Sequence, residues 1–107
     1  MKVAQVVHFR VKPDSWDDVL DLVARWQQEH LADQDGVVDT FIWREMHDKN
    51  NGTALVFCNS EEDLNRFSAD PVTLTFFEAA KSFLVEEPNY FHVEVTTADI
   101  LKMRHLQ

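Results

Sequence analysis

Two histidines in strand-like segments are the side chains of this chain best suited to proton transfer. His8 lies in an alternating apolar segment over residues 3–11, and His92 lies in a second such segment over residues 90–96. A histidine exchanges its proton near neutral pH, so either residue could act as a general base, while Arg10 could hold an anionic oxygen. The alternative is that both histidines are ordinary polar members of neighbouring strands.

Three residues near these histidines have side chains that commonly bind ligands. Arg10, Tyr90 and Glu94 have the same sequence parity as the histidines, so we expect them on the same face of the sheet. If that face lines a cavity between sheet and helices, the five residues meet there. Two imidazoles and a carboxylate are also a common set of metal ligands. Many strands carry such a pair without metal, and we expect no metal here.

Aromatic residues and one amide complete the candidate site. We expect Trp43, Phe77 and Tyr90 to form the walls of a pocket for a small apolar or aromatic molecule. Asn59, at the end of a predicted strand, could donate a hydrogen bond to an oxygen of that molecule, although an asparagine before a helix more often serves the local turn. Glu94 is the carboxylate of this candidate binding site.

The order of the periodic segments predicts which elements position these side chains. Strand-like and helix-like segments follow one another as β-α-β-β-α-β, the order of a ferredoxin-like fold. We therefore expect an α+β sandwich in which helices cover one face of a four-stranded antiparallel sheet with strand order 4-1-3-2. The predicted strands cover residues 3–11, 38–45, 53–59 and 90–96, and the predicted helices cover residues 16–31 and 61–84, the second with a break near residue 70.

Local signals support these elements. Gly36 is expected to follow the end of the first helix, because glycine readily adopts the left-handed conformation that a helix C-terminus often needs. Ser60 and Asp63 resemble a capping box at the start of the second helix. Trp16 and Trp26 lie on the apolar stripe of the first helix, so we assign both to the core.

Composition excludes several classes of protein. The 107 residues are 45% apolar with only two glycines, which favours one folded domain over residues 1–107, with residues 98–107 as a C-terminal tail. A net charge of −9 would repel a phosphate backbone, so we expect no nucleic-acid partner. Cys58 cannot pair within the chain, and its apolar strand predicts a buried, inert thiol. No segment is apolar enough to span a bilayer, and we expect a cytoplasmic protein that does not bind membranes.

Both faces of the predicted sheet carry apolar side chains. We expect one face to hold Val7, Phe9, Phe91 and Val93, and the other to hold Ala4, Val6 and Val56. The helices cover only one face, so the other needs a separate cover. A homodimer that packs sheet on sheet is the simplest cover, and a monomer whose tail folds over the sheet is the alternative.

With this element order, the chain resembles the dimeric α/β-barrel superfamily, and within it the antibiotic-biosynthesis monooxygenase type of domain. The resemblance covers residues 3–96. The local patterns that carry it are Asp35-Gly36 before the second strand, Ser60-Glu61-Glu62-Asp63-Leu64, and Ser68-Ala69-Asp70-Pro71-Val72 leading into Phe76-Phe77-Glu78-Ala79-Ala80. It implies a homodimer that oxidises a small aromatic or quinol-like molecule with dioxygen and needs no cofactor.

Several positions depart from that family's pattern. Family members often end the third strand with Glu-x-Trp, where this chain has Val56 and Cys58, and a histidine of the family's second helix appears here as Phe67. The motifs of nucleotide cofactors, thiol redox enzymes, zinc proteases and serine hydrolases do not occur in the sequence. Two main hypotheses remain. The chain is a cofactor-independent monooxygenase with His8 or His92 as the base, or a non-catalytic small-molecule-binding or stress-associated protein of the same fold. An isomerase or lyase using the same base is a third.

Overall fold

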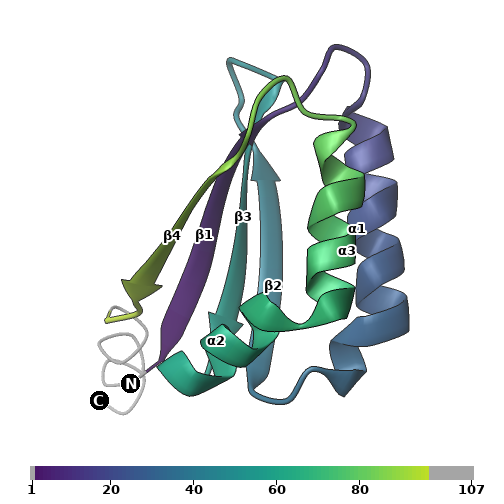
Figure 1. Ribbon diagram of the computed structural model, residues 1–107. Helices are drawn as coiled ribbons and strands as arrows, with labels where there is room; N and C mark the ends of the chain where they lie inside the picture. The colour runs from purple at the N-terminus through teal and green to yellow at the C-terminus, as the bar shows by residue number, and fades with distance from the viewer. Residues whose placement is uncertain (1, 97–107) are drawn as a thin grey trace.

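The computed structural model describes residues 2–96 as a four-stranded antiparallel sheet with its helices on one face (Figure 1). The strands are β1 (Val3–Arg10), β2 (Val37–Arg44), β3 (Asn51–Cys58) and β4 (Asn89–Glu94). The helices are α1 (Trp16–His30), α2 (Glu61–Ala69) and α3 (Pro71–Lys81), and a short 3-10 helix, η1 (Leu31–Asp33), follows α1. The sheet order is β2-β3-β1-β4, so the predicted ferredoxin-like α+β fold is confirmed. The predicted tail, residues 98–107, lies outside the described residues.

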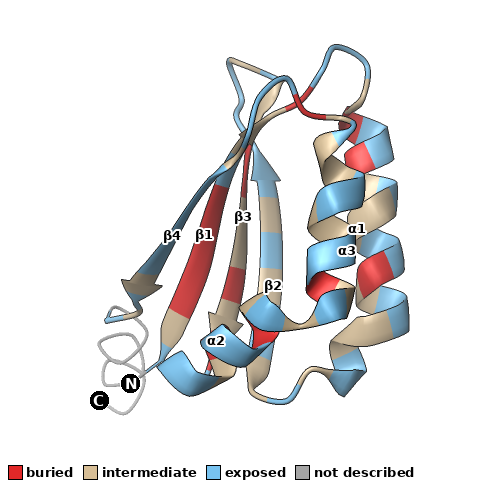
Figure 2. Cartoon of the chain, viewed as in Figure 1, coloured by how far each residue is buried: buried red, intermediate tan, exposed pale blue. Residues whose placement is uncertain are grey.

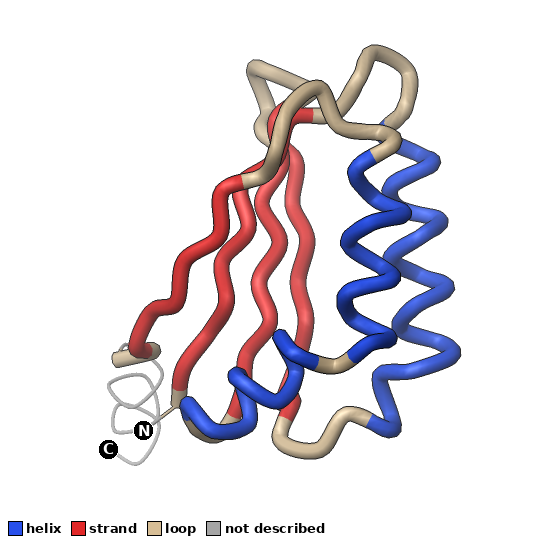
Figure 3. The backbone as a smooth tube through the Cα atoms, in the orientation of Figure 1, coloured by secondary structure: helices blue, strands red, loops and turns tan. Residues whose placement is uncertain are grey.

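The ends of the helices follow local sequence signals. Gly36 has a φ of +83°, the left-handed conformation that glycine adopts without strain, but it lies in the turn directly before β2 and not, as the sequence predicted, at the end of α1. Ser60 accepts a hydrogen bond from the N–H of Asp63 at 3.2 Å, which satisfies a free amide at the start of α2. Asp70 caps α3 by accepting a hydrogen bond from the N–H two residues later at 2.8 Å. Because Pro71 cannot continue a helix, α2 and α3 are separate helices (Figure 3).

The register between strands decides which side chains face the helices. Val7 of β1 lies opposite Tyr90 of β4, and His8 of β1 lies opposite Thr53 of β3. Residues directly opposite each other in neighbouring strands share a face of the sheet. In both pairs the residue numbers add to an odd number, so odd residues of β1 share a face with even residues of β3 and β4.

We call the face under the helices the inner face and the opposite face the open face. The inner face consists of Val3, Gln5, Val7 and Phe9 of β1, Thr40 and Ile42 of β2, Ala54, Val56 and Cys58 of β3, and Tyr90, His92 and Glu94 of β4. The open face consists of Ala4, Val6, His8 and Arg10 of β1, Phe41 and Trp43 of β2, Asn51, Thr53, Leu55 and Phe57 of β3, and Asn89, Phe91 and Val93 of β4. No helix of residues 2–96 lies over the open face (Figure 1).

This register corrects the expected grouping of apolar residues. Phe91 and Val93 lie on the open face and Val56 lies on the inner face, the reverse of the expectation. Parity within one strand does not fix its register against a neighbour, and a shift of one residue moves every side chain to the other face. Both faces are nevertheless partly apolar, as expected. On the open face the apolar side chains include Phe41 and Phe91, which are each about half exposed.

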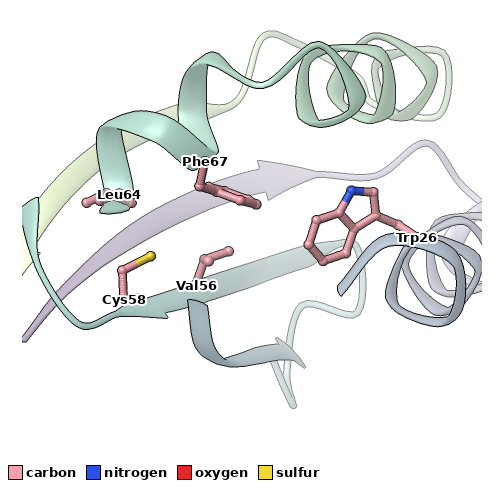
Figure 4. Packing of buried hydrophobic residues seen from close by; sticks show 5 residues of the cluster. All are labelled: Trp26, Val56, Cys58, Leu64 and Phe67. Carbon is pink, nitrogen blue, oxygen red and sulfur yellow. The ribbon is translucent and has the colours of Figure 1, made fainter. Parts of the chain in front are cut away.

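The core lies between the inner face and the helices (Figure 2). In one of its two clusters, Leu64 and Phe67 of α2 and Trp26 of α1 point toward Val56 and Cys58 of β3 (Figure 4). The second cluster is formed by Val11, Trp16, Val19 and Leu84. The predicted core positions of Trp16 and Trp26 are therefore confirmed. No helix within residues 2–96 is long and apolar enough to cross a membrane.

The thiol of Cys58 is completely buried in the first cluster. Burial, with a smaller contribution from the negative charge of Asp63, raises its pKa from 9.0 to about 11. A thiol with this pKa is almost fully protonated at neutral pH and is a poor nucleophile. The prediction that this thiol is buried is confirmed.

Candidate functional site

A groove of about 390 Å³ opens on the open face, between the turn that joins β2 to β3 and the segment that leads from α3 into β4. A volume of this size is within the usual range for small-molecule sites. Its lining includes His8 and Arg10 of β1, Trp43 of β2, Thr53 of β3, and Glu86 from the α3–β4 segment. The groove thus combines an aromatic surface with groups that exchange protons or donate hydrogen bonds.

Neighbours on two sides hold the imidazole of His8. Its Nδ1 lies 2.8 Å from Oγ1 of Thr53, the residue directly opposite on β3. On the β4 side, its ring packs against Phe91 with a centroid distance of 5.3 Å and an interplanar angle of 45°. Nε2 has no hydrogen-bond partner among residues 2–96, so this nitrogen is available to a ligand in the groove.

Arg10 is engaged with the turn that joins β2 to β3. Its Nη1 donates to Oδ2 of Asp48 at 2.9 Å and to Oδ1 of Asn51 at 2.8 Å. The hydrogen bond from Arg10 is the largest cause that lowers the pKa of Asp48 below its usual value. Asn51 in turn donates to Asp48 at 3.0 Å. The charge of Arg10 is therefore compensated by the protein itself, which makes it a weaker anion-binding group than the sequence suggests.

Carboxylates form part of the groove's lining. Glu45, Glu86 and Glu87 all line it. Glu87 is paired with Lys81 at 3.4 Å, and Glu45 accepts a hydrogen bond from Asn51 at 3.3 Å. Because like charges repel, this acidic lining disfavours a ligand that is already an anion and favours a neutral one.

Between the inner face and the helices there are two smaller cavities, of about 50 and 60 Å³. Residues shared by both linings are Val7, Val23, Ile42, Ala54, Phe76 and Phe77. None of the described residues that line them is titratable. Their size is far below that of a typical ligand site, so we assign them to packing.

The structure brings together three of the predicted site residues. His8, Arg10 and Trp43 all line the open-face groove. Phe77 and Tyr90 instead pack edge to face on the inner side of the sheet, with their ring centroids 5.4 Å apart. The predicted aromatic walls are therefore divided between two faces, and only Trp43 lies in the groove.

The expectation that His8 and His92 share a face is wrong. His92 lies opposite Gln5 on the inner face, at the edge strand β4, and Glu94 lies on the same side. The two histidines therefore cannot bind one metal ion together with Glu94. No group of three or more metal-binding side chains gathers within the described part of the chain.

Asn59 lies apart from the groove. It follows β3, its side chain is exposed, and its backbone N–H donates to the carbonyl of Gly36 at 2.9 Å. This backbone hydrogen bond joins the end of β3 to the turn before β2, and the local turn role of the Asn59 side chain stays a prediction.

Three residues at the groove, Thr53, Asn51 and Asp48, were not predicted from the sequence. They belong to a turn and strand about 40 positions after the first strand, and pairing of β1 with β3 is what brings them to His8 and Arg10. Their residue types are common in turns and strand ends, so nothing in their local sequence distinguishes them.

Comparisons with known proteins support the fold. No protein-family model matches the chain, and no curated protein sequence matches it. Among solved structures, a conserved protein from Methanosarcina mazei is 18% identical, with a TM-score of 0.78 over 88% of this chain and 92% of that chain.

Two further structures carry names that indicate an activity. A variant of SnoaB, a cofactor-independent oxygenase from Streptomyces nogalater, is 20% identical, with a TM-score of 0.77 over 89% of this chain and 93% of that chain. An antibiotic biosynthesis monooxygenase-like protein from Caulobacter crescentus is 12% identical, with a TM-score of 0.79 over 89% of this chain and 90% of that chain. As the resemblance in the sequence implied, the chain has the ferredoxin-like fold of the antibiotic biosynthesis monooxygenase-like proteins.

Proposed function

We propose that this protein is a cofactor-independent monooxygenase that oxidises a small aromatic or quinol-like molecule in the open-face groove. The observation that carries the proposal is the meeting of His8, Thr53 and the half-exposed Trp43 around one groove of about 390 Å³. The likeness of the fold to SnoaB, which is named a cofactor-independent oxygenase, supports the reaction class.

The proposed chemistry needs an activated substrate. The substrate is an aromatic ketone, such as anthrone, that has a methylene group conjugated with the ketone. Loss of a proton from the methylene carbon gives an enolate, and this enolate reduces dioxygen directly. Dioxygen adds to the carbon to give a hydroperoxide, and loss of water leaves a second ketone. In balance, the methylene group and one dioxygen molecule become a carbonyl group and one water molecule, with one oxygen atom retained in the product. Trp43 supplies the aromatic surface, and His8 contacts the oxygen that becomes anionic.

Oxygen uptake tests this proposal directly. Purified protein would be mixed with anthrone or a naphthoquinol under ¹⁸O-labelled dioxygen, and the product would be analysed by mass spectrometry. With anthrone we expect protein-dependent oxygen uptake and one ¹⁸O atom in the quinone product. Uptake no faster than in buffer with any member of an anthrone and quinol series would contradict the enzymatic proposal.

We also infer that the protein is a homodimer, paired through the apolar part of the open face beside the groove, where Phe91 contacts His8. This part consists of apolar residues: Ala4, Val6, Phe41, Leu55, Phe57, Phe91 and Val93. Phe41 and Phe91 are each more than 40% exposed, and a second sheet would remove them from water. Light scattering should give a dimer mass for the wild type and a monomer mass for Phe91→Glu. A wild-type monomer would contradict this inference.

A second candidate function is binding without turnover. It is favoured by the small, apolar inner cavities and by Val56 and Cys58, which replace the carboxylate and indole of the family's Glu-x-Trp pattern. A protein of this kind would show a ligand-dependent rise in Tm with no oxygen uptake.

A further inference from the structure

We propose that Thr53 positions His8 so that a protonated Nε2, and not its lone pair, faces the groove. His8 is then a hydrogen-bond donor to an oxygen of the ligand. The identity of the ligand rests on the proposed function, whereas the state of His8 does not.

The hydroxyl of Thr53 needs an acceptor for its proton. The residue is 8% exposed, and its Oγ1 lies 2.8 Å from Nδ1 of His8. Within residues 2–96 this nitrogen is the single partner found for the hydroxyl. A buried hydroxyl left without an acceptor for its proton costs free energy. The hydroxyl therefore donates its proton to Nδ1.

The hydrogen bond from Thr53 determines the tautomer of the imidazole. In a neutral histidine one ring nitrogen carries the proton and the other accepts. Because Nδ1 of His8 accepts from Thr53, the proton of the neutral ring is on Nε2. Contact with Phe91 on the other side of the residue helps to hold this ring orientation.

In the reaction, the Nε2–H of His8 is a hydrogen-bond donor to the ligand. A ketone oxygen of the ligand accepts the Nε2–H of His8. When the acidic carbon conjugated with that ketone loses its proton, the electron pair of the C–H bond is delocalised onto this oxygen, and the hydrogen bond strengthens as the charge develops. His8 thus stabilises the enolate and does not remove the proton.

The proton then needs another acceptor. Carboxylates are the bases that line the groove, and Glu86 has no ion-pair partner within the described residues. We therefore assign the base to this acidic lining. The same carboxylates select a ligand that enters neutral, so the class of ligand is a neutral aromatic molecule with an oxygen acceptor.

Nitrogen NMR tests the state of His8 without any ligand. Protein labelled with ¹⁵N-histidine would be studied at pH 8, with the His8 signals identified by their loss in His8→Gln. We expect a protonated Nε2 and an unprotonated Nδ1. In Thr53→Val the fraction with a protonated Nδ1 should rise, and Thr53→Ser should restore the wild-type spectrum. A protonated Nδ1 in the wild type, or identical spectra for wild type and Thr53→Val, would overturn the proposal.

A matched pair of ligands tests the role of the donor. 1-Methoxynaphthalene has an oxygen acceptor and no donor, and 1-ethylnaphthalene has nearly the same shape without the oxygen. A donor at His8 should favour the ether by about two- to tenfold in Kd. Thr53→Val should reduce this preference, and Thr53→Ser should keep it. Equal binding of both compounds to the wild type would overturn the donor role.

The two sets of results also separate this inference from the proposed function. If neither naphthalene binds but the NMR spectrum shows a protonated Nε2, the ligand class fails and the tautomer assignment stands. If the ether binds preferentially but no oxygen is consumed, the donor role stands and the function is binding.

Discussion

The hollows on the two faces of this sheet have opposite chemistry, although the same strands line them. On the inner face, cavities of about 50 and 60 Å³ are lined mainly by apolar side chains, and Gln27 and Thr40 bind each other at 2.7 Å. On the open face, a groove of about 390 Å³ contains an imidazole, a guanidinium and carboxylates. The larger, polar hollow is the better candidate for a ligand site.

Strand alternation produces this difference within a few residues. Val7 and Phe9 point to the helices and line an inner cavity, while His8 between them points to the groove. A substitution in one strand can therefore affect mainly the core or mainly the groove, although Phe9 and Gly52 of the inner face also line the groove. Substitutions on the two faces should therefore have different effects.

The largest effect should come from removing a buried side chain on the inner side. Leu64 is fully buried in the cluster that joins α2 to β3. Leu64→Ala should lower the free energy of unfolding by about 2–5 kcal/mol, because it removes buried apolar surface and leaves a cavity. Urea unfolding would measure the change in the free energy of unfolding. Trp43→Ala on the open face is the control and should cost clearly less, so equal losses would contradict the separation of roles.

The next effect concerns activity and compares the two histidines. His8→Ala should reduce oxygen uptake roughly 100-fold or more, the usual cost of losing a donor to a developing anion. His92→Ala, on the opposite face, should leave the rate nearly unchanged. Stability should change little in His92→Ala, whose side chain is exposed, and more in His8→Ala, which leaves the buried hydroxyl of Thr53 without its partner. A similar loss of rate in both variants would show that the groove is not the site.

Gly52 belongs to both regions, because it lies opposite Phe9 on the inner face and also lines the groove. A Cβ at this position would lie 2.6 Å from the ring of Phe9 and 2.8 Å from the ring of Trp16. Gly52→Ala should therefore destabilise the protein by about 1–3 kcal/mol, as overpacking does. Thermal unfolding would measure the change, with Thr53→Ser as the neighbouring control. An unchanged Tm would mean that the rings move aside without cost.

A smaller effect should appear at high pH. The pKa of Cys58 is raised to about 11 in the folded protein, so between pH 9 and 11 the folded state binds more protons than the unfolded state. Its contribution to stability is complete below pH 9 and is lost as the pH rises toward 11. Burial also raises the pKa of Tyr90, which acts in the same direction. Cys58→Ala should show a shallower fall in unfolding free energy over this range, and an unchanged slope would contradict the burial of the thiol.

Much of the fold could be predicted because it depends on local patterns. Periodicity indicated the order of the elements, and the stripe containing Trp16 and Trp26 identified the core side of α1. The capping role of Ser60 also follows from nearby residues. These features need information from a few turns of chain only.

The candidate site could be predicted only in part because it depends on register. The residue types of His8, Arg10 and Trp43 were sufficient to select them, and the structure places them together. Assigning His92 to the same face failed because register is a property of two paired strands. The pairing of Arg10 with Asp48 depends on the same long-range contact between β1 and β3, and no pattern along the chain predicts it.

We expect the open-face groove, and not the inner cavities, to bind the ligand. The indole N–H signals of tryptophan report on both regions, because Trp43 lines the groove and Trp26 lines an inner cavity. A titration of ¹⁵N-labelled protein with 1-methoxynaphthalene would follow these signals by NMR. We expect the Trp43 signal to shift with ligand concentration while the Trp26 signal stays in place. A shift of Trp26 with an unchanged Trp43 would contradict this and place the ligand near Trp26, either in the inner cavity or in the groove of about 360 Å³ between α1 and α3.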